Sequence, residues 1–531
     1  MTDAANAGEP TPPGGPGTDF RPRGGLVGFF VMVLGMFMAI LDIQIVASSL
    51  PEIQAGVSAS LEEVTWVQTA YLVAEVVMIP LSGWLAQVFS SRWLFAASAA
   101  GFTVTSVACA FSWDITSLIV FRAAQGFIGG GMIPTVFAAI YKLLPLRRRM
   151  LGTVIVGLTA TVAPAAGPTI GGWITENFSW HWLFLANVVP GLFVTIAVPT
   201  LADMDRPNLK LLGHIDLIGI ALVAGFLGSL EYVLDEGPRE DWFANDTILT
   251  FAIVSAVSGV LLIWRERVAE HPVIDLRVFA NRNFALGCVL VFIVGMCLYG
   301  QTFILPQILS QVRGYNSMQI GHVMFVTGAA MFCTAPIAGR ISHALDPRMP
   351  LFLGFFLVAT GLWLNAQMTV EVGFDQLLAP QIVRGVGLMM CIVPITSTAL
   401  GTMDHELVSI GSGLFNVFRN MGGAVALSTI NTQWDARYDL HYWRLAESMP
   451  AGRPETEAFI QGVQDRMAQF WPQLGNTDLA SYAATARTVA QQANIMAWND
   501  IFFMLSVAFV IFAPLILLQA KPSGGDGGGG H

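Results

Sequence analysis

The sequence predicts an all-α polytopic membrane protein with fourteen transmembrane helices. The first reason is composition: 54% of the 531 residues are hydrophobic and 12% are charged, with a mean hydropathy of +0.62. Soluble domains carry about 25% charged residues, so this composition is typical of a membrane protein. The net charge is −10 and the basic residues are scattered, so we expect no nucleic-acid partner. The other two reasons are the pattern of apolar runs and an internal repeat.

The apolar runs define the predicted helices in order. A helix that crosses a bilayer needs about 20 mostly apolar residues. Six runs come before residue 205, two lie in the middle of the chain and six follow. An even number of spans places both termini on one side of the membrane. The predicted spans are 26–50, 64–86, 92–111, 115–141, 150–175, 182–202, 214–234, 246–264, 282–310, 317–342, 349–369, 376–400, 408–431 and 498–519.

Basic residues predict the orientation of these spans. With fourteen spans, nearly all loop and tail lysines and arginines fall on one face, whereas the short loops of the other face hold only Arg239 and Arg313. Loops rich in Lys and Arg stay in the cytoplasm. We therefore expect a multi-pass membrane protein with both termini cytoplasmic. The long polar segment 431–497 then lies outside.

The two halves of the chain resemble each other, which predicts the domain organisation. "IPLSGWLA" (79–86) is similar to "APIAGRIS" (335–342), and "VFRAAQGFIGGGMIP" (120–134) is similar to "IVRGVGLMMCIVP" (382–394). Parallel repeats of this kind are the plan of a large class of transporters, with the substrate site at the repeat interface. The predicted divisions are a disordered cytoplasmic tail (1–25), an N-terminal six-helix bundle (26–205), two linker helices (206–270), a C-terminal six-helix bundle (271–520) containing a periplasmic helical hairpin (431–497), and a Gly-rich cytoplasmic tail (521–531).

An aspartate interrupts the first apolar run, in "FMAILDIQIVASSLP". A carboxylate at membrane depth is costly and therefore marks a function or has a partner. Asp42 lies about 12 Å and Arg122 about 10 Å from the external ends of their helices, at 1.5 Å per residue. The matching depths allow the two side chains to form an ion pair. Two alternatives remain at this point: a proton-coupling site or a structural ion pair that never titrates.

Other charged residues also lie inside predicted spans. Glu75 is near the middle of the second span, where polar side chains normally face the bundle interior. It is a second candidate for proton coupling, or else a neutral, hydrogen-bonded acid. Arg384 and Arg419 are expected to contribute charge to a substrate cavity of mixed sign. Glu231 lies close to the end of its span, and we expect its side chain to reach solvent.

A small-residue motif, "APAAGPTIGGW" (163–173), lies in the fifth span. Gly167, Gly171 and Gly172 leave a face without bulky side chains, so that another helix can approach closely. Pro164 and Pro168 loosen the helix at the same place. The alternative interpretation is an ordinary helix-packing seam.

Taken together, the motifs of this chain resemble those of the major facilitator superfamily. Within it the chain is similar to the fourteen-span drug:H⁺ antiporters of the EmrB/QacA type, more so to the EmrB-like members, from about residue 26 to 520. The motifs that carry this resemblance are "LDIQIVASSLP", "LIVFRAAQGFIGGGMIP", "APAAGPTIGGW", "WHWLFLANVVPG", "HIDLIGIAL", "EYVLDEGPREDWF" and "PVIDLRVFANRNF".

The resemblance implies a major facilitator fold, a place in the bacterial inner membrane and a function. The protein would be an antiporter that uses the proton gradient, without a cofactor or metal, to export hydrophobic or amphipathic drugs or toxic compounds. The family has an acid in span one and an arginine in span four near the proton path, which correspond to Asp42 and Arg122. Its antiporter motif, here "APAAGPTIGGW", lies where the two halves meet.

The resemblance also implies partners, and one loop departs from the family pattern. EmrB-like proteins work with a periplasmic adaptor protein and an outer-membrane channel, and the segment 431–497 is the candidate docking surface. The superfamily usually has Gly-x-x-x-Asp after span two, but "GWLAQVFSSRW" places Gln87 at the position of the aspartate. The usual charge contact on the cytoplasmic side is therefore in question.

Two other classes of function remain open from sequence. An uptake transporter of another major facilitator subfamily would share the fold, although symporters generally lack the antiporter motif. A membrane-embedded enzyme or receptor is the rival from another class. No nucleotide-binding loop, metal-ligand set or nucleophile motif is visible in the sequence, which argues against an enzyme.

Overall fold

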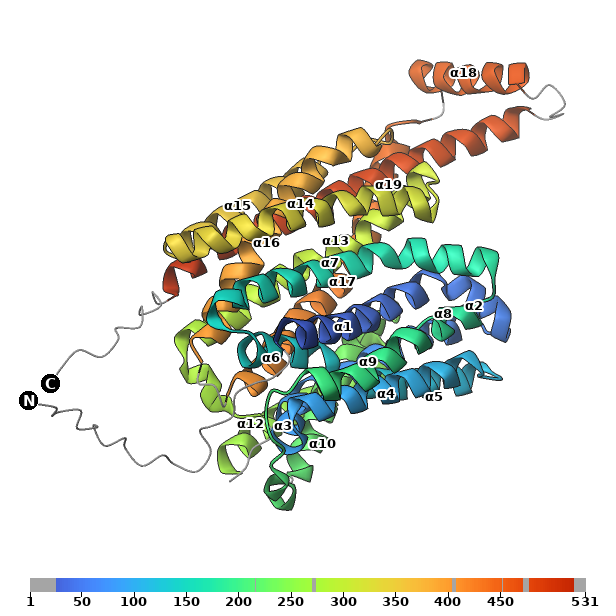
Figure 1. The fold of residues 1–531 in the computed structure, drawn as a ribbon. Coiled ribbons are helices and arrows are strands. Elements are labelled where there is room, and N and C mark those ends of the chain that lie inside the picture. The colour runs from blue at the N-terminus through green and yellow to red at the C-terminus, as the bar shows by residue number, and fades with distance from the viewer. Residues whose placement is uncertain are drawn as a thin grey trace, which may run out of the picture.

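The computed structural model describes residues 25–214, 216–269, 274–403, 407–450, 452–470 and 477–519, and within these ranges every long element is a helix (Figure 1). The predicted tails before residue 25 and after residue 520 lie outside them. The first part of the chain forms α1 (Gly25–Ser48), α2 (Leu50–Val57), α3 (Leu61–Phe89), α4 (Ser91–Ala110), α5 (Ile115–Gly129), α6 (Met132–Leu143), α7 (Leu146–Asn177), α8 (His181–Leu185) and α9 (Val188–Leu201).

The middle of the chain forms two short connected spans, and the last part forms long helices. The middle contains η1 (Leu209–His214), α10 (Leu217–Val223), the π-helical turn η2 (Ala224–Gly228), α11 (Ser229–Glu236), η3 (Trp242–Ala244), α12 (Asp246–Val268) and η4 (Leu276–Ala280). The last part contains α13 (Arg282–Arg313), α14 (Ser317–Ala344), α15 (Arg348–Asn365), α16 (Phe374–Gly401), α17 (Val408–Glu447), α18 (Pro454–Phe470), α19 (Thr477–Phe512) and η5 (Ala513–Leu518).

The number of candidate spans is lower than the sequence predicts. Among the described residues, 12 helices are long and apolar enough to cross a membrane, or 13 if the bent helix α7 counts as one span. The remaining predicted span, 408–431, is helical and mostly buried within α17. This segment is not among the apolar candidate spans because its sequence "VSIGSGLFNVFRNMGG" is rich in Gly, Ser and Asn. A helix surrounded by other helices does not need a continuous apolar surface.

Helix ends follow local sequence signals. Ser60 accepts a hydrogen bond from the Glu63 backbone N–H at 3.2 Å, and the Glu63 carboxylate accepts one from the Ser60 backbone N–H at 2.8 Å. This reciprocal capping box starts α3. Asp114 caps α5 in the same way, and the hydrogen bonds from Ser117 lower the pKa of its carboxyl.

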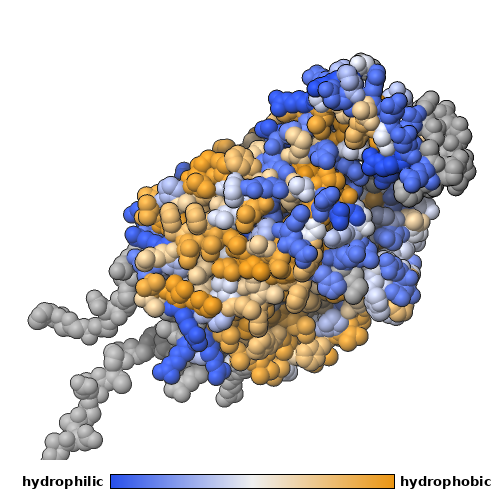
Figure 2. Space-filling view, turned by 90° about the horizontal axis from the view of Figure 1, so that it is seen from above, coloured by the Kyte–Doolittle hydropathy of each residue, from blue (hydrophilic) through white to orange (hydrophobic). Residues whose placement is uncertain are grey.

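The helical body has two distinguishable ends and an apolar flank. We call "basic end" the end that carries Lys142 at the close of α6, Arg147–Arg149 at the start of α7, and Arg265 and Arg267 at the close of α12. We call "hairpin end" the opposite end, where α17 and α19 extend beyond the body toward α18 (Figure 1). Apolar side chains gather over the flank between them, and polar ones cover the hairpin end (Figure 2).

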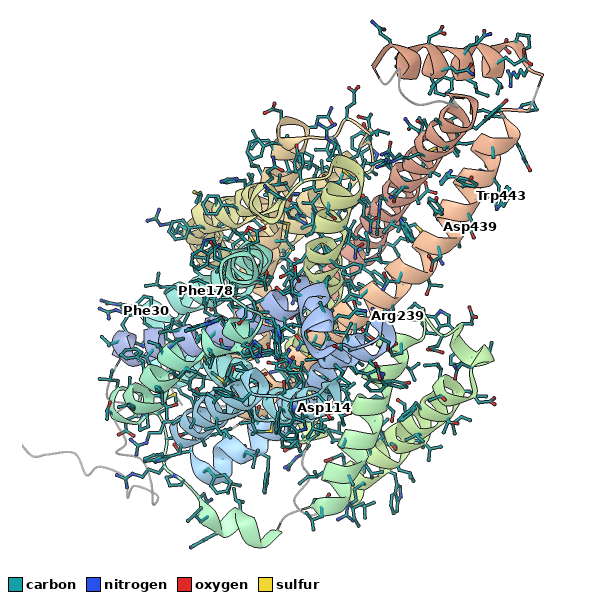
Figure 3. The ribbon with its side chains drawn as sticks, turned by 90° about the vertical axis from the view of Figure 1, so that its right-hand side faces the viewer. Phe30, Asp114, Phe178, Arg239, Asp439 and Trp443 are labelled. Atoms are coloured by element: carbon teal, nitrogen blue, oxygen red, sulfur yellow. The ribbon has the colours of Figure 1, made fainter. Side chains whose placement is uncertain are left out.

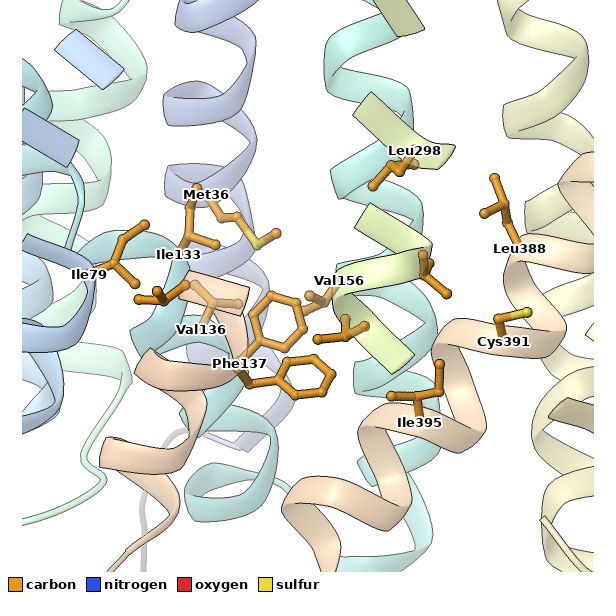
Figure 4. Packing of buried hydrophobic residues seen from close by; sticks show 14 of the residues in the cluster. Met36, Ile79, Ile133, Val136, Phe137, Val156, Leu298, Leu388, Cys391 and Ile395 are labelled. Atoms are coloured by element: carbon orange, nitrogen blue, oxygen red, sulfur yellow. The ribbon is translucent and has the colours of Figure 1, made fainter. Parts of the chain in front are cut away.

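One apolar core joins helices from both halves of the chain. It includes Phe29, Phe95 and Phe137 from the first half, and Phe284 and Phe355 from the second, all at most 4% exposed. Figure 4 shows Phe137 next to Val156 of α7, between Met36 and Ile133 on one side and Leu388 and Ile395 on the other. The two halves are therefore in direct contact around α6 and α7.

The segment 431–497, predicted as a helical hairpin, contains the end of α17, all of α18 and the start of α19. Asp439 and Trp443 lie on the part of α17 that leaves the body (Figure 3). Trp434 stacks on Tyr438 at 5.4 Å and contacts Trp498 of α19 at 5.6 Å. α18 packs on α19 and carries half-exposed Phe459. The side chains of Met467 and Phe470, part of the predicted apolar stripe, lie outside the described set.

Candidate functional site

Asp42 and Arg122 form a fully buried ion pair. The distance from Arg122 Nη1 to Asp42 Oδ2 is 2.6 Å, and both side chains are 0% exposed. This ion pair confirms that the two predicted residues meet. Asp42 lies on α1 and Arg122 lies on α5. A buried pair of this kind is stable only while both partners remain, because loss of one leaves an uncompensated charge.

Three polar side chains that sequence reasoning missed complete the surroundings of Asp42. Asn187 donates to Asp42 Oδ1 at 2.6 Å. Gln125 accepts from Arg122 Nη1 at 2.7 Å, and Ser106 accepts from both Gln125 and Asn187. Gln125 was detectable, since a residue three positions after Arg122 lies on the same helix face. Asn187 was not, because only the tertiary structure places the start of α9 beside α1.

Tyr71 covers the guanidinium of Arg122. The Arg122 Cζ atom lies 4.2 Å from the centre of the Tyr71 ring, a cation–π contact, and Arg122 Nε donates to the Val67 carbonyl at 3.2 Å. Glycines allow α5, which carries Arg122, to lie close to α3, which carries Tyr71. A Cβ on Gly126 would lie 2.2 Å from the Tyr71 carbonyl oxygen, and one on Gly130 would lie 2.8 Å from that of Glu75. The motif "QGFIGGGMIP" thus brings the backbone of α5 against α3.

Glu75 lies in the same charged region and is 4% exposed. Its carboxyl interacts electrostatically with Arg419 most strongly among charges, then with Arg122 and Asp42. Arg419 belongs to α17, in the other half of the chain, and its Cζ atom lies 5.3 Å from the centre of the Phe137 ring. The structure therefore gathers Asp42, Glu75, Arg122 and Arg419, and the Glu75–Arg419 attraction crosses between the halves.

Glu231 corrects one prediction. We expected its side chain to reach solvent, but the residue is only 8% exposed. The reason is that α11 packs against α3, α12 and α17, so that the face carrying Glu231 turns inward. Its carboxyl interacts electrostatically with Asp235 and Glu75. It is therefore an interior acid near the candidate site.

Arg384 has a different environment from Arg122. It is 4% exposed and donates to Thr327 Oγ1 at 2.7 Å and to the Gln381 side-chain oxygen. No carboxylate of the described residues lies within 4.0 Å of it. Gln301, on α13, reaches the same Gln381 oxygen at 3.4 Å. The second half thus repeats the buried arginine of the first half with neutral partners.

The small-residue motif packs closely on α1. A Cβ on Gly167 would lie 2.4 Å from Gln44 Cβ, and one on Gly171 would lie 2.8 Å from Ser48 Oγ. Both partners belong to α1, so these two glycines pack within the first half of the chain. Gly172 is partly exposed. The contact between halves is instead made from the adjacent face of α7, where Thr169 touches Gly321 of α14.

The same motif bends α7, as the prolines predict. The axes of the segments 147–164 and 169–177 differ by 44°, with Pro164 ending the first segment and Pro168 lying between them. A proline removes one backbone hydrogen bond and clashes with the preceding turn, which kinks a helix. The side chain of Pro168 lies outside the described set.

At the basic end the two halves touch each other directly. Tyr141 at the end of α6 donates to the Thr396 carbonyl of α16 at 3.0 Å. A Cβ on Gly83 of α3 would lie 2.9 Å from Ile410 Cα of α17. The halves are therefore closed against each other at this end.

The loop that lacks the usual aspartate obtains a carboxylate from another segment. Asp205, which follows α9, accepts hydrogen bonds from Ser90 and Ser91 and pairs with Lys142 at 2.8 Å. Burial alone would raise the pKa of Asp205, but the charge of Lys142 and these hydrogen bonds together lower it below its ordinary value. Asp205 thus joins the start of α4 to the end of α6.

Comparison with known proteins identifies the family. The Major Facilitator Superfamily model matches residues 32–427. The colistin resistance protein EmrB of Acinetobacter baumannii is 42% identical over 493 residues, which cover 93% of this chain and 96% of that protein. The multidrug export protein EmrB of Escherichia coli is 31% identical, covering 94% and 96%. The fatty acid resistance protein FarB of Neisseria gonorrhoeae is 31% identical, covering 97% and 100%.

Solved structures show the same fold. The proton:xylose symporter XylE has a TM-score of 0.57 at 11% identity, covering 93% of this chain and 95% of that one. The human organic anion transporter MFSD10 has a TM-score of 0.55 at 12% identity, covering 91% and 98%. The helical architecture, the matched family model and the relatives agree: the chain is a multi-span membrane transporter, not an enzyme, and belongs to the EmrB-like drug efflux proteins of the major facilitator superfamily.

Proposed function

We propose that this transporter exchanges protons for hydrophobic or amphipathic compounds and exports them from the cytoplasm. The observation that carries the proposal is the buried Asp42–Arg122 pair with Glu75 and Arg419 beside it. Ionisable groups inside membrane-spanning helices commonly form proton relays. Here Asp42 pairs with Arg122 of its own half, and Glu75 is attracted electrostatically by Arg122 and by Arg419 of the other half.

The arrangement supports a charge-exchange mechanism. A proton on Asp42 neutralises the partner of Arg122, and leaving that arginine unpaired would cost about 3–5 kcal/mol. Glu75 is the neighbouring carboxylate that takes over the pairing. Glu75 then attracts Arg419 less, which weakens the electrostatic link between the halves. Proton binding on Asp42 and closure of the two halves are thereby linked. A substrate that binds better to the arrangement with unprotonated Asp42 therefore lowers the affinity of Asp42 for the proton.

The proposed topology follows the distribution of basic residues. We propose that the basic end faces the cytoplasm and the hairpin end the periplasm of a bacterium with two membranes. The bent helix α7 and residues 408–431 of α17 then complete fourteen spans. The proposed division is one bundle over 26–205, two linker helices over 206–270 and a second bundle over 271–520. Membrane lipids surround the apolar flank.

The proposed substrates are small compounds with a large apolar part. The relatives are named for colistin resistance, multidrug export and fatty acid resistance, so their names cover compounds of several chemical kinds. The interior charges are also mixed, with Asp42, Glu75 and Glu231 against Arg122, Arg384 and Arg419. A site of mixed sign suits several ligand charges better than a purely acidic one.

The extended helices support a partnership outside the membrane. We propose that α17, α18 and α19 dock a periplasmic adaptor protein that leads to an outer-membrane channel. Apolar and aromatic side chains such as Trp443 (63% exposed) and Tyr482 (60% exposed) lie on this projection. Exposed apolar side chains outside the bilayer are typical of protein contact surfaces.

Proton release on substrate binding tests the proposed antiport. Purified transporter in weakly buffered solution should release protons when a lipophilic compound is added. Asp42→Asn should bind the compound without this release and should lose uphill efflux in vesicles, while Glu75→Gln should reduce both. One proton moving down about 100 mV supplies roughly 2.3 kcal/mol, enough for about a fifty-fold gradient of a neutral compound.

Glu176→Gln is the matched control, since Glu176 is an exposed acid at the hairpin end of α7. It should behave as the unmodified protein. Normal proton-driven efflux by Asp42→Asn would contradict the role of this residue. Proton uptake together with substrate would instead identify a symporter.

A further inference from the structure

The linker segment formed by η2 and α11 turns one face toward α3. A Cβ on Gly228 would lie 3.4 Å from a Val77 methyl group of α3. Seven residues later, Asp235 Oδ2 accepts a hydrogen bond from the Thr69 hydroxyl, also on α3. Residues at positions i, i+3 and i+7 share one face of a helix. Glu231 therefore lies between these two contacts and faces α3 as well.

The register of the two helices places Glu231 almost level with Glu75. The contacts show that α3 and α11 run antiparallel, since the later residue of α11 meets the earlier residue of α3. Glu231 comes four residues before Asp235, so it is level with the residue four positions after Thr69. Glu75 is two residues further along α3, about 3 Å deeper at 1.5 Å per residue. The two carboxyl groups also interact electrostatically.

Glu231 has neither a cation nor a hydrogen-bond donor as a partner. It is 8% exposed, accepts no hydrogen bond from any described residue, and the charges that act on it belong to Asp235 and Glu75. From α17 comes Arg419, which attracts Glu75. The neighbouring helix α12 carries charged residues only at its two ends. Glu231 is therefore not part of a structural ion pair, and unpaired acids inside membrane-spanning helices commonly belong to proton pathways.

The hairpin end of α11 offers a place where protons from solution bind. The Thr69 hydroxyl donates to Asp235 and lies 3.2 Å from Glu236 Oε1, so one hydroxyl proton faces two carboxylates. Half-exposed Arg239, just after α11, pairs with Glu236 at 3.5 Å (Figure 3). Asp235 is partly exposed and has no basic side chain within 4.0 Å among the described residues. The next carboxylate inward on the same helix face is Glu231.

The basic end offers no comparable entrance in this conformation. There the halves are closed by the hydrogen bond from Tyr141 to the Thr396 carbonyl and by the contact of Gly83 with Ile410. Protons that reach Glu75 in this conformation therefore come from the hairpin end.

We propose that Glu231 is the relay that carries protons from Asp235 to Glu75. This inference rests on the proposed proton coupling, because a relay is needed only if interior acids take up protons. A proton passes from the Asp235 carboxyl to the Glu231 carboxylate and then to the Glu75 carboxylate, which leaves Asp235 ionised to take the next proton from water. Helix positions i and i+4 are about 5–6 Å apart between Cβ atoms, a gap that two flexible acidic side chains span. The linker helices thus supply protons to the pair of bundles.

Infrared spectroscopy after a pH step measures this path without any substrate. Full-length transporter in lipid nanodiscs is shifted from pH 8 to pH 5, and the growth of the carbonyl band of protonated carboxyl groups is followed in time. The part of the band that is missing in Glu75→Gln belongs to Glu75. Glu231→Gln should slow the growth of this part about tenfold or more and leave its final size unchanged, because a relay sets the rate and not the equilibrium.

Three further variants make the result specific. Glu231→Asp keeps a carboxylate and should stay within about threefold of the unmodified rate, so a misfolded Glu231→Gln protein does not decide the outcome. Asp235→Asn should slow the growth as Glu231→Gln does. Asp246→Asn removes an exposed acid at the hairpin end of α12, the other linker helix, and should leave the rate unchanged.

Four results would overturn the relay. They are an unchanged rate in Glu231→Gln, an equal slowing in Asp246→Asn, loss of the final Glu75 band in Glu231→Gln, and absence of any Glu75 band in the unmodified protein. The loss of the final band would show that Glu231 sets the protonation equilibrium of Glu75 and is not a path to it.

The relay and the proposed antiport fail in different ways. Normal proton release on addition of a lipophilic compound, with an unchanged Glu75 protonation rate in Glu231→Gln, would contradict the relay alone. Proton-driven efflux that survives Asp42→Asn, with slowed protonation of Glu75 in Glu231→Gln, would contradict the coupling role of Asp42 alone.

Discussion

Buried charges in this transporter differ in how completely they are compensated. Arg122 has a carboxylate, an amide oxygen, a backbone carbonyl and an aromatic ring around its guanidinium. Among the described residues, Arg384 has a hydroxyl and an amide oxygen as its hydrogen-bond acceptors. The carboxylate of Asp42 holds the charge of Arg122 in place, and a proton on that carboxylate can break the pairing. The Arg122 site therefore suits a switch between two charge arrangements. The second suits a permanent positive potential in its half of the molecule.

Asp205 provides a prediction at the residue scale. Asp205→Asn should lower the free energy of unfolding by about 1–3 kcal/mol at pH 7, because the carboxylate holds Lys142 and two serine hydroxyls. Its pKa is lowered in the folded protein, from an ordinary value of 3.8. The stabilisation is therefore present above pH 3.8 and is lost as the pH falls through the lower folded-state value.

Thermal unfolding in detergent at pH 7, 5 and 3 measures this effect. The difference in Tm between the unmodified protein and Asp205→Asn should be constant from pH 7 to 5 and smaller at pH 3. Asp246→Asn, which removes an exposed acid outside any ion pair found within the described residues, is the control. A Tm difference that grows as the pH falls would show that the pair does not stabilise the loop.

At the scale of single elements, α7 combines a kink with a close helix contact. The bend of 44° lies between a segment that contacts α6 and α16 as well as α1 and α14, and a shorter one that contacts α1 and α14. Gly167 at the bend and Gly171 in the shorter segment allow α1, which carries Asp42, to lie directly on α7. Movement of α1 on protonation would therefore be transmitted to α7, and from Thr169 to α14 in the other half.

Gly167→Ala should impair turnover more than substrate binding. The added Cβ would lie 2.4 Å from Gln44 Cβ, so α1 and α7 must separate or the contact must distort. Overpacking of this kind costs about 1–3 kcal/mol. If most of this cost raises the free-energy barrier between the two conformations of the transport cycle, the transport rate falls about tenfold or more, while the dissociation constant of the substrate changes little.

Gly328→Ala is the matched control for this prediction. Its added Cβ would lie 3.4 Å from a Val162 methyl group, an ordinary contact between α14 and α7. It should transport normally in vesicles. Equal transport by the two variants would show that the α1–α7 contact is ordinary packing without a role in the conformational change.

At the scale of the whole molecule, the projection formed by α17 and α19 is anchored to the body by polar contacts. His441 Nε2 lies 2.9 Å and Arg437 Nη1 lies 3.3 Å from Asp500 Oδ2. Trp434 also donates to Asn494 at 3.2 Å. These contacts lie below α18, so removal of α18 leaves the pairing of α17 with α19 in place.

Removing residues 449–476 and joining Ser448 to Thr477 with a short Gly–Ser linker tests the role of α18. Transport in reconstituted vesicles should remain within about twofold of the full chain, because the charged region lies in the body. Drug resistance in cells with two membranes should be lost, because the exported compound would no longer reach the outer channel.

Gly462→Ala keeps α18 intact and should retain both activities, since its added Cβ would meet no atom within 4 Å. Resistance that survives the deletion would contradict adaptor docking through α18. Loss of vesicle transport as well would assign α18 to the transport cycle itself.

The amino-acid sequence alone determined where the long helices are. Each predicted span falls on helical residues, because a run of about 20 apolar residues is a local property. Helix rise allowed Asp42 and Arg122 to meet, as they do in the structure, and the bend of α7 lies at its prolines. These features depend on neighbours along the chain, so one sequence is enough to predict them.

The tertiary structure decided which face of each helix turns inward. In a membrane, lipid and protein interior are both apolar, so hydrophobic periodicity does not reveal the buried face. For this reason the burial of Glu231, the contact of Gly167 with α1 and the place of Asn187 beside Asp42 were not predictable. The hydrogen bonds from Ser90 and Ser91 to Asp205 and the attraction between Glu75 and Arg419 join residues more than 100 positions apart, and only the packing of α9 and α17 brings them together.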